Sequence, residues 1–70
     1  MKIFAQRVKS LRQEHKKTQK EMAEYLEIGL RAYQYYEGAK HYPDVPGLMK
    51  MADLFGVTTD YLLGRTEKRE

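Results

Sequence analysis

A chain of 70 residues makes one domain, near the smallest size at which a hydrophobic core outweighs the conformational entropy lost on folding, and its lack of cysteine excludes disulfides and thiolate metal sites. No apolar run approaches the roughly 18 residues that span a bilayer, so we expect a soluble, cytoplasmic protein without membrane contact. Residues 1–20 hold seven basic side chains and one acidic one, a net charge of +6 in a chain of net charge +3, which suits either a phosphate-binding surface or a solvated helix face.

The first predicted helix covers about residues 3–15. Apolar or helix-facing side chains recur there at spacings of four, three and four, namely Phe4, Val8, Leu11 and His15. We interpret His15 as a helix-end residue near the core.

A second helix is expected to begin after Thr18, because Thr18 and Glu21 have the spacing of a capping box. It ends after about eight residues, near residues 27–29. Its inward side chains are Met22, Ala23 and Leu26.

The third predicted helix covers about residues 29–37, and Gly29 suits both the turn and the start of this helix. Tyr33 and Tyr36 lie three apart and can face the core together. Four other side chains then point largely outward, namely Leu30, Arg31, Gln34 and Tyr35.

Two further helices follow a loop in which Pro43 prevents helix continuation. Asp44 can cap the fourth helix and Thr58 the short fifth, which runs through Leu63 and ends at Gly64. The fourth helix has a buried stripe of Leu48, Met51, Ala52 and Phe55. The sequence therefore predicts an all-α domain over residues 1–64 and a charged tail, residues 65–70, which we expect to be frayed.

A short helix, a tight turn and a second short helix form the layout of a helix-turn-helix unit. The segments that carry this resemblance are QKEMAEYL at 19–26, Ile28, RAYQYYE at 31–37, YPD at 42–44, ADLFGV at 52–57 and DYLLG at 60–64. Together they resemble the Xre family of phage repressor and Cro-like regulators, over about residues 4–65. The resemblance implies a compact five-helix, lambda-repressor-like DNA-binding domain whose helix-turn-helix is formed by the second and third helices. This sequence departs from the family at Glu27, where glycine is common, and at residues 38–40, which read Gly-Ala-Lys instead of Ala-Gly-Lys.

The resemblance also implies the DNA-facing residues. The third helix enters the major groove, where Arg31 suits guanine and Leu30 a thymine methyl group. The base-reading candidates are Leu30, Arg31, Gln34 and Tyr35. The phosphate-contacting candidates are Gln19, Lys20, Lys40 and His41.

Two structural roles are implied as well. Arg12 and Glu37 occupy positions that often form a partly buried ion pair in the family. Such regulators usually bind two half-sites as a two-fold dimer, so we expect a homodimeric repressor on a palindromic operator. The apolar candidates for the dimer contact are Phe55, Val57, Tyr61 and Leu62, for all of which core packing is the competing explanation.

Other classes of function fit the sequence less well. An enzyme is disfavoured, because the two histidines stand 26 positions apart without a matching carboxylate constellation, and the sequence has no Cys nucleophile, no Ser-His arrangement and no Gly-rich phosphate loop. We expect no metal site, no cofactor and no small-molecule ligand. RNA is disfavoured because A-form grooves do not admit such a helix. The remaining alternative is a helix-turn-helix that binds a protein partner, for example as an antitoxin, because fold alone does not fix function.

Overall fold

The computed structural model describes residues 2–70, and within that range it contains five helices and no strand. The helices are α1 (Lys2–Glu14), α2 (Gln19–Leu26), α3 (Leu30–Glu37), α4 (Val45–Phe55) and α5 (Thr59–Leu62). The predicted all-α class is therefore confirmed. Among the described residues, no helix is both long enough and apolar enough to cross a membrane.

Side-chain caps begin three of the helices, as the sequence predicts. The Thr18 hydroxyl accepts a hydrogen bond from the Glu21 amide at 3.0 Å, and the Glu21 carboxylate accepts one from the Thr18 amide at 2.8 Å. Asp44 accepts from the amide of Gly47 at 2.9 Å, and Thr58 caps α5 in the same way. These bonds satisfy amide groups that have no partner inside the helix.

Both departures from the family pattern place a side chain in left-handed backbone. Glu27, at the end of α2, has φ 58°, and Ala39, in the loop after α3, has φ 60°. Gly38, one position earlier, has an ordinary φ of −87°. The reversed order of glycine and alanine at 38–39 therefore leaves the strained position without glycine.

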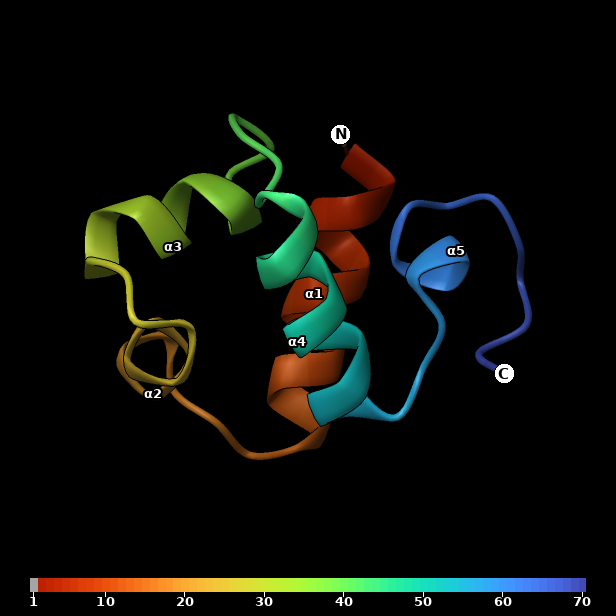
Figure 1. The fold of residues 1–70 in the computed structure, drawn as a ribbon, viewed down its shortest axis with the longest axis horizontal. Coiled ribbons are helices and arrows are strands. Elements are labelled where there is room, and N and C mark those ends of the chain that lie inside the picture. Colours follow the sequence, from red (N-terminus) through yellow and green to blue (C-terminus); the bar gives the residue numbers. More distant parts are fainter. Residues whose placement is uncertain (1) are drawn as a thin grey trace.

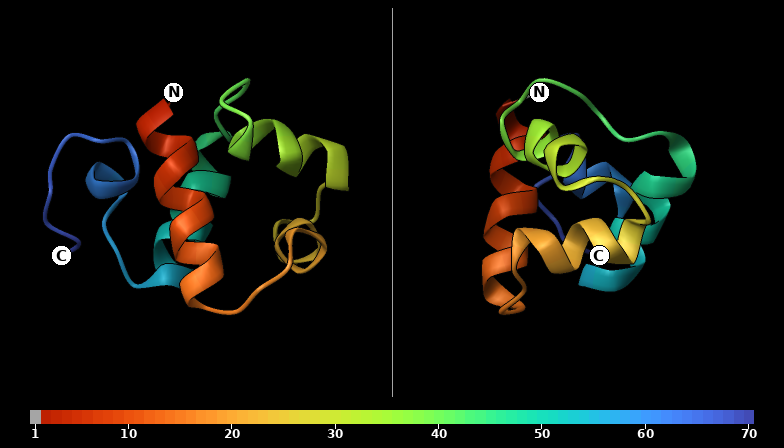
Figure 2. Two further views of the ribbon diagram at one scale, coloured as in Figure 1. Left: turned by 180° about the vertical axis from the view of Figure 1, so that it is seen from behind. Right: turned by 90° about the vertical axis from the view of Figure 1, so that its left-hand side faces the viewer.

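The core forms beside α1, which lies between the α2–α3 pair on one side and α5 on the other, while α4 packs against α2 and α5 (Figures 1 and 2). Seven large side chains are almost completely buried: Phe4, Val8, Leu11, Met22, Tyr33, Met51 and Leu62. Every helix contributes to this cluster, so the angle between α2 and α3 is fixed by packing against the rest of the domain.

The tail differs from the expectation of a frayed end. Residues 65–70 fold back around α5 (Figure 1), and the Arg69 carbonyl accepts a hydrogen bond from the Thr58 amide at 2.8 Å. Arg69 also donates two hydrogen bonds to the Glu14 carboxylate, at 2.9 and 2.8 Å. Arg7 of α1 donates to one carbonyl of α5 and one of the tail. Long-range partners of these arginines, which local sequence does not reveal, hold the tail in place.

Candidate nucleic-acid interface

The α2–α3 pair forms one edge of the molecule, on the side opposite α5 and the C-terminus (Figure 1). Tyr33 points inward from α3 and is fully buried, whereas Leu30 on the other side of the helix is 44% exposed. We define the α3 outer face as Leu30, Arg31, Gln34 and Tyr35. The first three are exposed and Tyr35 is half-buried. This helix therefore offers a mixed polar and apolar surface to solvent along its whole length.

The loop after α3 lies against the end of this face. The Lys40 amide donates to the Tyr35 carbonyl at 2.9 Å, and the His41 ring meets the Tyr35 ring edge-on, with centroids 5.2 Å apart. Both Lys40 and His41 are exposed. The structure thus brings the two predicted phosphate-contacting residues of this loop next to a predicted base-reading one.

Gln19, the first residue of α2, lies beside α3. Its side-chain amide nitrogen donates to Glu37 Oε1 at 3.1 Å, and its oxygen accepts from the Gln34 side chain at 3.3 Å. Lys20, the next residue, is exposed. The sequence pointed to Gln19 only as a phosphate contact, because nothing in its local pattern shows a link to residues 15 and 18 positions further on.

An ion pair anchors the end of α3 to α1. Arg12 Nε lies 2.7 Å from Glu37 Oε2, and its Nη2 donates to Glu37 Oε1 at 3.2 Å. The third nitrogen of Arg12 donates to the Lys17 carbonyl at 2.9 Å, and the Tyr33 hydroxyl donates to the same carboxylate. The Arg12 and Glu37 side chains are only 13% and 5% exposed, so the family-like ion pair is present and nearly closed to water.

The surroundings of Glu37 keep it ionised. Burial alone would raise the pKa of its carboxyl, but hydrogen bonds from Arg12, Tyr33 and Gln19 outweigh burial and hold the pKa below its usual value. The same pairing raises the pKa of Arg12. The pKa of Tyr33 is raised by burial and by the neighbouring Glu37 carboxylate, so its hydroxyl keeps its proton and remains a donor.

Comparison with known proteins identifies the fold. Residues 5–68 match the family model of a helix-turn-helix domain. The chain belongs to this family. None of the solved structures gave a significant match.

Curated relatives of this helix-turn-helix domain carry regulator names. The chain is 45% identical over 64 residues to the HTH-type transcriptional regulator ImmR of Bacillus subtilis, covering 91% of this chain and 50% of ImmR. It is 37% identical over 65 residues to the cryptic phage CTXphi transcriptional repressor RstR of Vibrio cholerae, covering 93% of this chain and 57% of RstR. These relatives confirm the resemblance to Xre-type regulators. The chain spans about half the length of the curated relatives it matches.

The four candidate residues for the dimer contact differ in how far the structure exposes them to solvent. Phe55 and Leu62 lie in the core, 5% and 0% exposed, and so offer almost no surface to a partner. Val57 and Tyr61 are half-buried, and the Arg7 guanidinium covers the Tyr61 ring at 4.1 Å from its centroid. Two apolar residues of α4 that the sequence analysis did not name, Val45 and Met49, are 70% and 55% exposed. Their spacing of four, outside the buried stripe, was the available signal.

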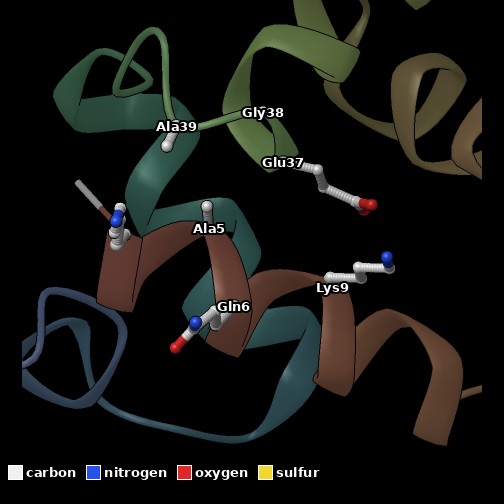
Figure 3. Close-up of a pocket in the computed structure, with 7 residues that line it drawn as sticks. Ala5, Gln6, Lys9, Glu37, Gly38 and Ala39 are labelled. Carbon is white, nitrogen blue, oxygen red and sulfur yellow. The ribbon is translucent and has the colours of Figure 1, made fainter.

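An open groove of about 350 Å³ lies between the first half of α1 and the end of α3 (Figure 3). Its lining comprises Lys2, Ala5, Gln6, Lys9, Glu37, Gly38 and Ala39. Figure 3 shows the amino group of Lys9 and the carboxylate of Glu37 directed to the same end of the groove. Ala39 directly precedes Lys40 in the loop after α3. The groove therefore places Lys2 and Lys9 close to the loop that carries Lys40 and His41.

Proposed function

We propose that this helix-turn-helix domain binds double-stranded DNA and regulates transcription, with α3 in the major groove. The observation that carries the proposal is the α3 outer face, where Leu30, Arg31 and Gln34 are exposed while Tyr33 on the same helix is fully buried. A helix held by its inner face, with polar side chains outward, is the form of a major-groove reader. The names of ImmR and RstR, a transcriptional regulator and a transcriptional repressor, support this function and favour repression.

The roles of the individual side chains follow from their chemistry. Arg31 can donate two hydrogen bonds to guanine, and Leu30 can contact a thymine methyl group. Tyr35 lies one helical turn beyond Arg31 and would contact the rim of the DNA major groove. Around this face, four residues would contact the phosphates without reading sequence, namely Gln19, Lys20, Lys40 and His41.

A homodimer on a palindromic operator is the second part of the proposal. One domain of this size buries little surface on DNA, and two half-sites supply the missing affinity. The exposed pair Val45 and Met49 supports a dimer contact on α4, because these large apolar side chains are 70% and 55% exposed to solvent. Sedimentation equilibrium of the wild type and of Met49→Lys tests this part. An identical dissociation constant of the dimer in both proteins would exclude α4 from the interface.

The test of DNA binding is selection of preferred sites from a random duplex library, followed by fluorescence anisotropy on selected and scrambled duplexes over a salt series. Arg31→Ala is compared with Arg65→Ala, which removes the same charge from an exposed side chain just after α5, paired with Asp60 of that helix. Helix α5 lies on the side of the molecule opposite α3 (Figure 1). We expect Arg31→Ala to lower the preference for the selected site by about 5- to 150-fold, while weak salt-dependent binding to both duplexes persists. Arg65→Ala should leave the preference unchanged.

Either of two results would contradict this function. If the wild type selects no sequence, the alternative of a protein-binding helix-turn-helix takes the lead. If both arginine variants weaken binding equally on all duplexes, only general charge attraction operates and α3 does not read bases.

A further inference from the structure

A continuous chain of hydrogen bonds connects the buried ion pair to the α3 outer face. Arg12 holds the Glu37 carboxylate, Glu37 Oε1 accepts from the Gln19 amide at 3.1 Å, and Gln19 accepts from Gln34 at 3.3 Å. Gln34 is exposed, and it is one of the side chains that α3 offers to a base. The fixed interior of the domain is therefore connected to a DNA-facing amide.

The buried carboxylate of Glu37 sets the donor and acceptor of each hydrogen bond in this chain. An ionised carboxylate only accepts hydrogen bonds, and Glu37 accepts four, two from Arg12, one from Tyr33 and one from Gln19. The Gln19 group that faces Glu37 must accordingly be its NH₂. Its carbonyl oxygen then faces Gln34 and needs a donor, so Gln34 must turn its own NH₂ toward Gln19. Gln19 keeps one free N–H, which is compatible with a phosphate contact.

We propose that Gln34 reads adenine, and that Gln19 and Glu37 are positioning residues that fix the orientation of its amide. This inference rests on the proposed function, because it requires α3 in the major groove. With one N–H engaged by Gln19, Gln34 presents one N–H and one carbonyl oxygen. Adenine offers the matching pair, an acceptor at N7 and a donor at N6, whereas guanine offers two acceptors, N7 and O6. The locked amide would set its carbonyl oxygen against one guanine acceptor.

Loss of Gln19 frees the amide of Gln34 to rotate and give both N–H groups to guanine. The discrimination between adenine and guanine at one operator position should therefore narrow, although Gln19 itself touches no base there. If Gln19 acts only through the fold or through its phosphate contact, its loss weakens binding to every sequence alike and leaves the ratio of adenine to guanine binding unchanged.

The experiment uses the selected operator and compares wild type with Gln34→Ala, Gln19→Ala and the equally long Gln19→Met. Gln13→Ala is the matched control, since Gln13 is exposed on α1 and its side chain makes no hydrogen bond within the described chain. The position of interest is the one at which Gln34→Ala loses its base preference. Anisotropy is then measured with adenine, guanine, 7-deazaadenine, which lacks the N7 acceptor, or purine, which lacks the N6 amino group, at that position.

For the wild type we expect about tenfold tighter binding to adenine than to guanine or to either analogue. Gln34→Ala should bind all four alike. Both Gln19 variants lose the proposed phosphate contact and should bind every duplex less tightly, and in addition their adenine preference should narrow several-fold at that position alone. Gln13→Ala should behave as the wild type. Melting curves establish that each variant is folded.

Three results would overturn the inference while DNA binding stands. They are a selected sequence unchanged in Gln34→Ala, a guanine preference at its position, or an adenine preference that both Gln19 variants keep while they bind every sequence more weakly. Absence of any selected sequence with the wild type would refute the proposed function, and the inference with it.

Discussion

Replacing the two members of the Arg12–Glu37 ion pair singly and together tests whether this buried pair acts as one unit. Glu37→Met leaves the Arg12 guanidinium, 13% exposed, without its carboxylate, and it leaves the Tyr33 hydroxyl in the core without an acceptor. Removal of one partner of a buried pair costs about 3–5 kcal/mol. A chain of 70 residues has a total stability of about 4–10 kcal/mol, so Glu37→Met alone should remove a large part of it.

Thermal and urea unfolding followed by circular dichroism measure the effect. A loss of 3 kcal/mol lowers the melting temperature of a domain this small by about 12–24 °C. Arg12→Met should be similarly costly, because it strands the Glu37 carboxylate and the Lys17 carbonyl. The double variant buries two apolar side chains instead of one unpaired charge, so it should be more stable than the sum of the single losses predicts, by about 0.5–3 kcal/mol. A loss of stability in the double variant equal to the sum of the two single losses would refute the coupling.

Three further predictions concern backbone strain, pH and the tail. Glu27→Gly should raise the free energy of unfolding by about 1 kcal/mol, because Glu27 has φ 58°, whereas Gly56→Ala, at φ 67° in open space, should lower it by about the same amount. Melting temperatures that shift in the same direction would contradict this. The pKa of the Glu37 carboxyl lies below its ordinary 4.5, so the stability that the ionised carboxylate contributes is fully present above pH 4.5 and is lost as the pH falls further. In acid titrations, the difference in unfolding free energy between wild type and Glu37→Gln should therefore shrink below pH 4.5. Arg7→Met should speed hydrogen exchange of the Thr58 amide, whose acceptor lies in the tail that Arg7 holds, and an unchanged rate would exclude that role.

Local sequence was enough to predict the helices. Their boundaries follow from nearby residues, such as Thr18 with Glu21 for α2 and Asp44 for α4, whose side chains reach amides three positions on. The inward face of α3 follows from the spacing of Tyr33 and Tyr36. The same spacing predicts which side chains of α3 point outward, since they lie opposite the buried face, and the resemblance to Xre regulators gives those side chains a DNA-facing role.

Sequence alone therefore determined the elements, their buried faces and the helix-turn-helix layout, because these depend on contacts within a few residues. Only the tertiary structure decided which apolar residues are buried in the core, so that Leu62 is buried while Val45 is exposed. It also decided that Gln19 lies between Glu37 and Gln34, and that Arg69 reaches Glu14 across 55 positions. Such contacts join distant segments, and their geometry is set by the packing of whole helices, which no local pattern encodes.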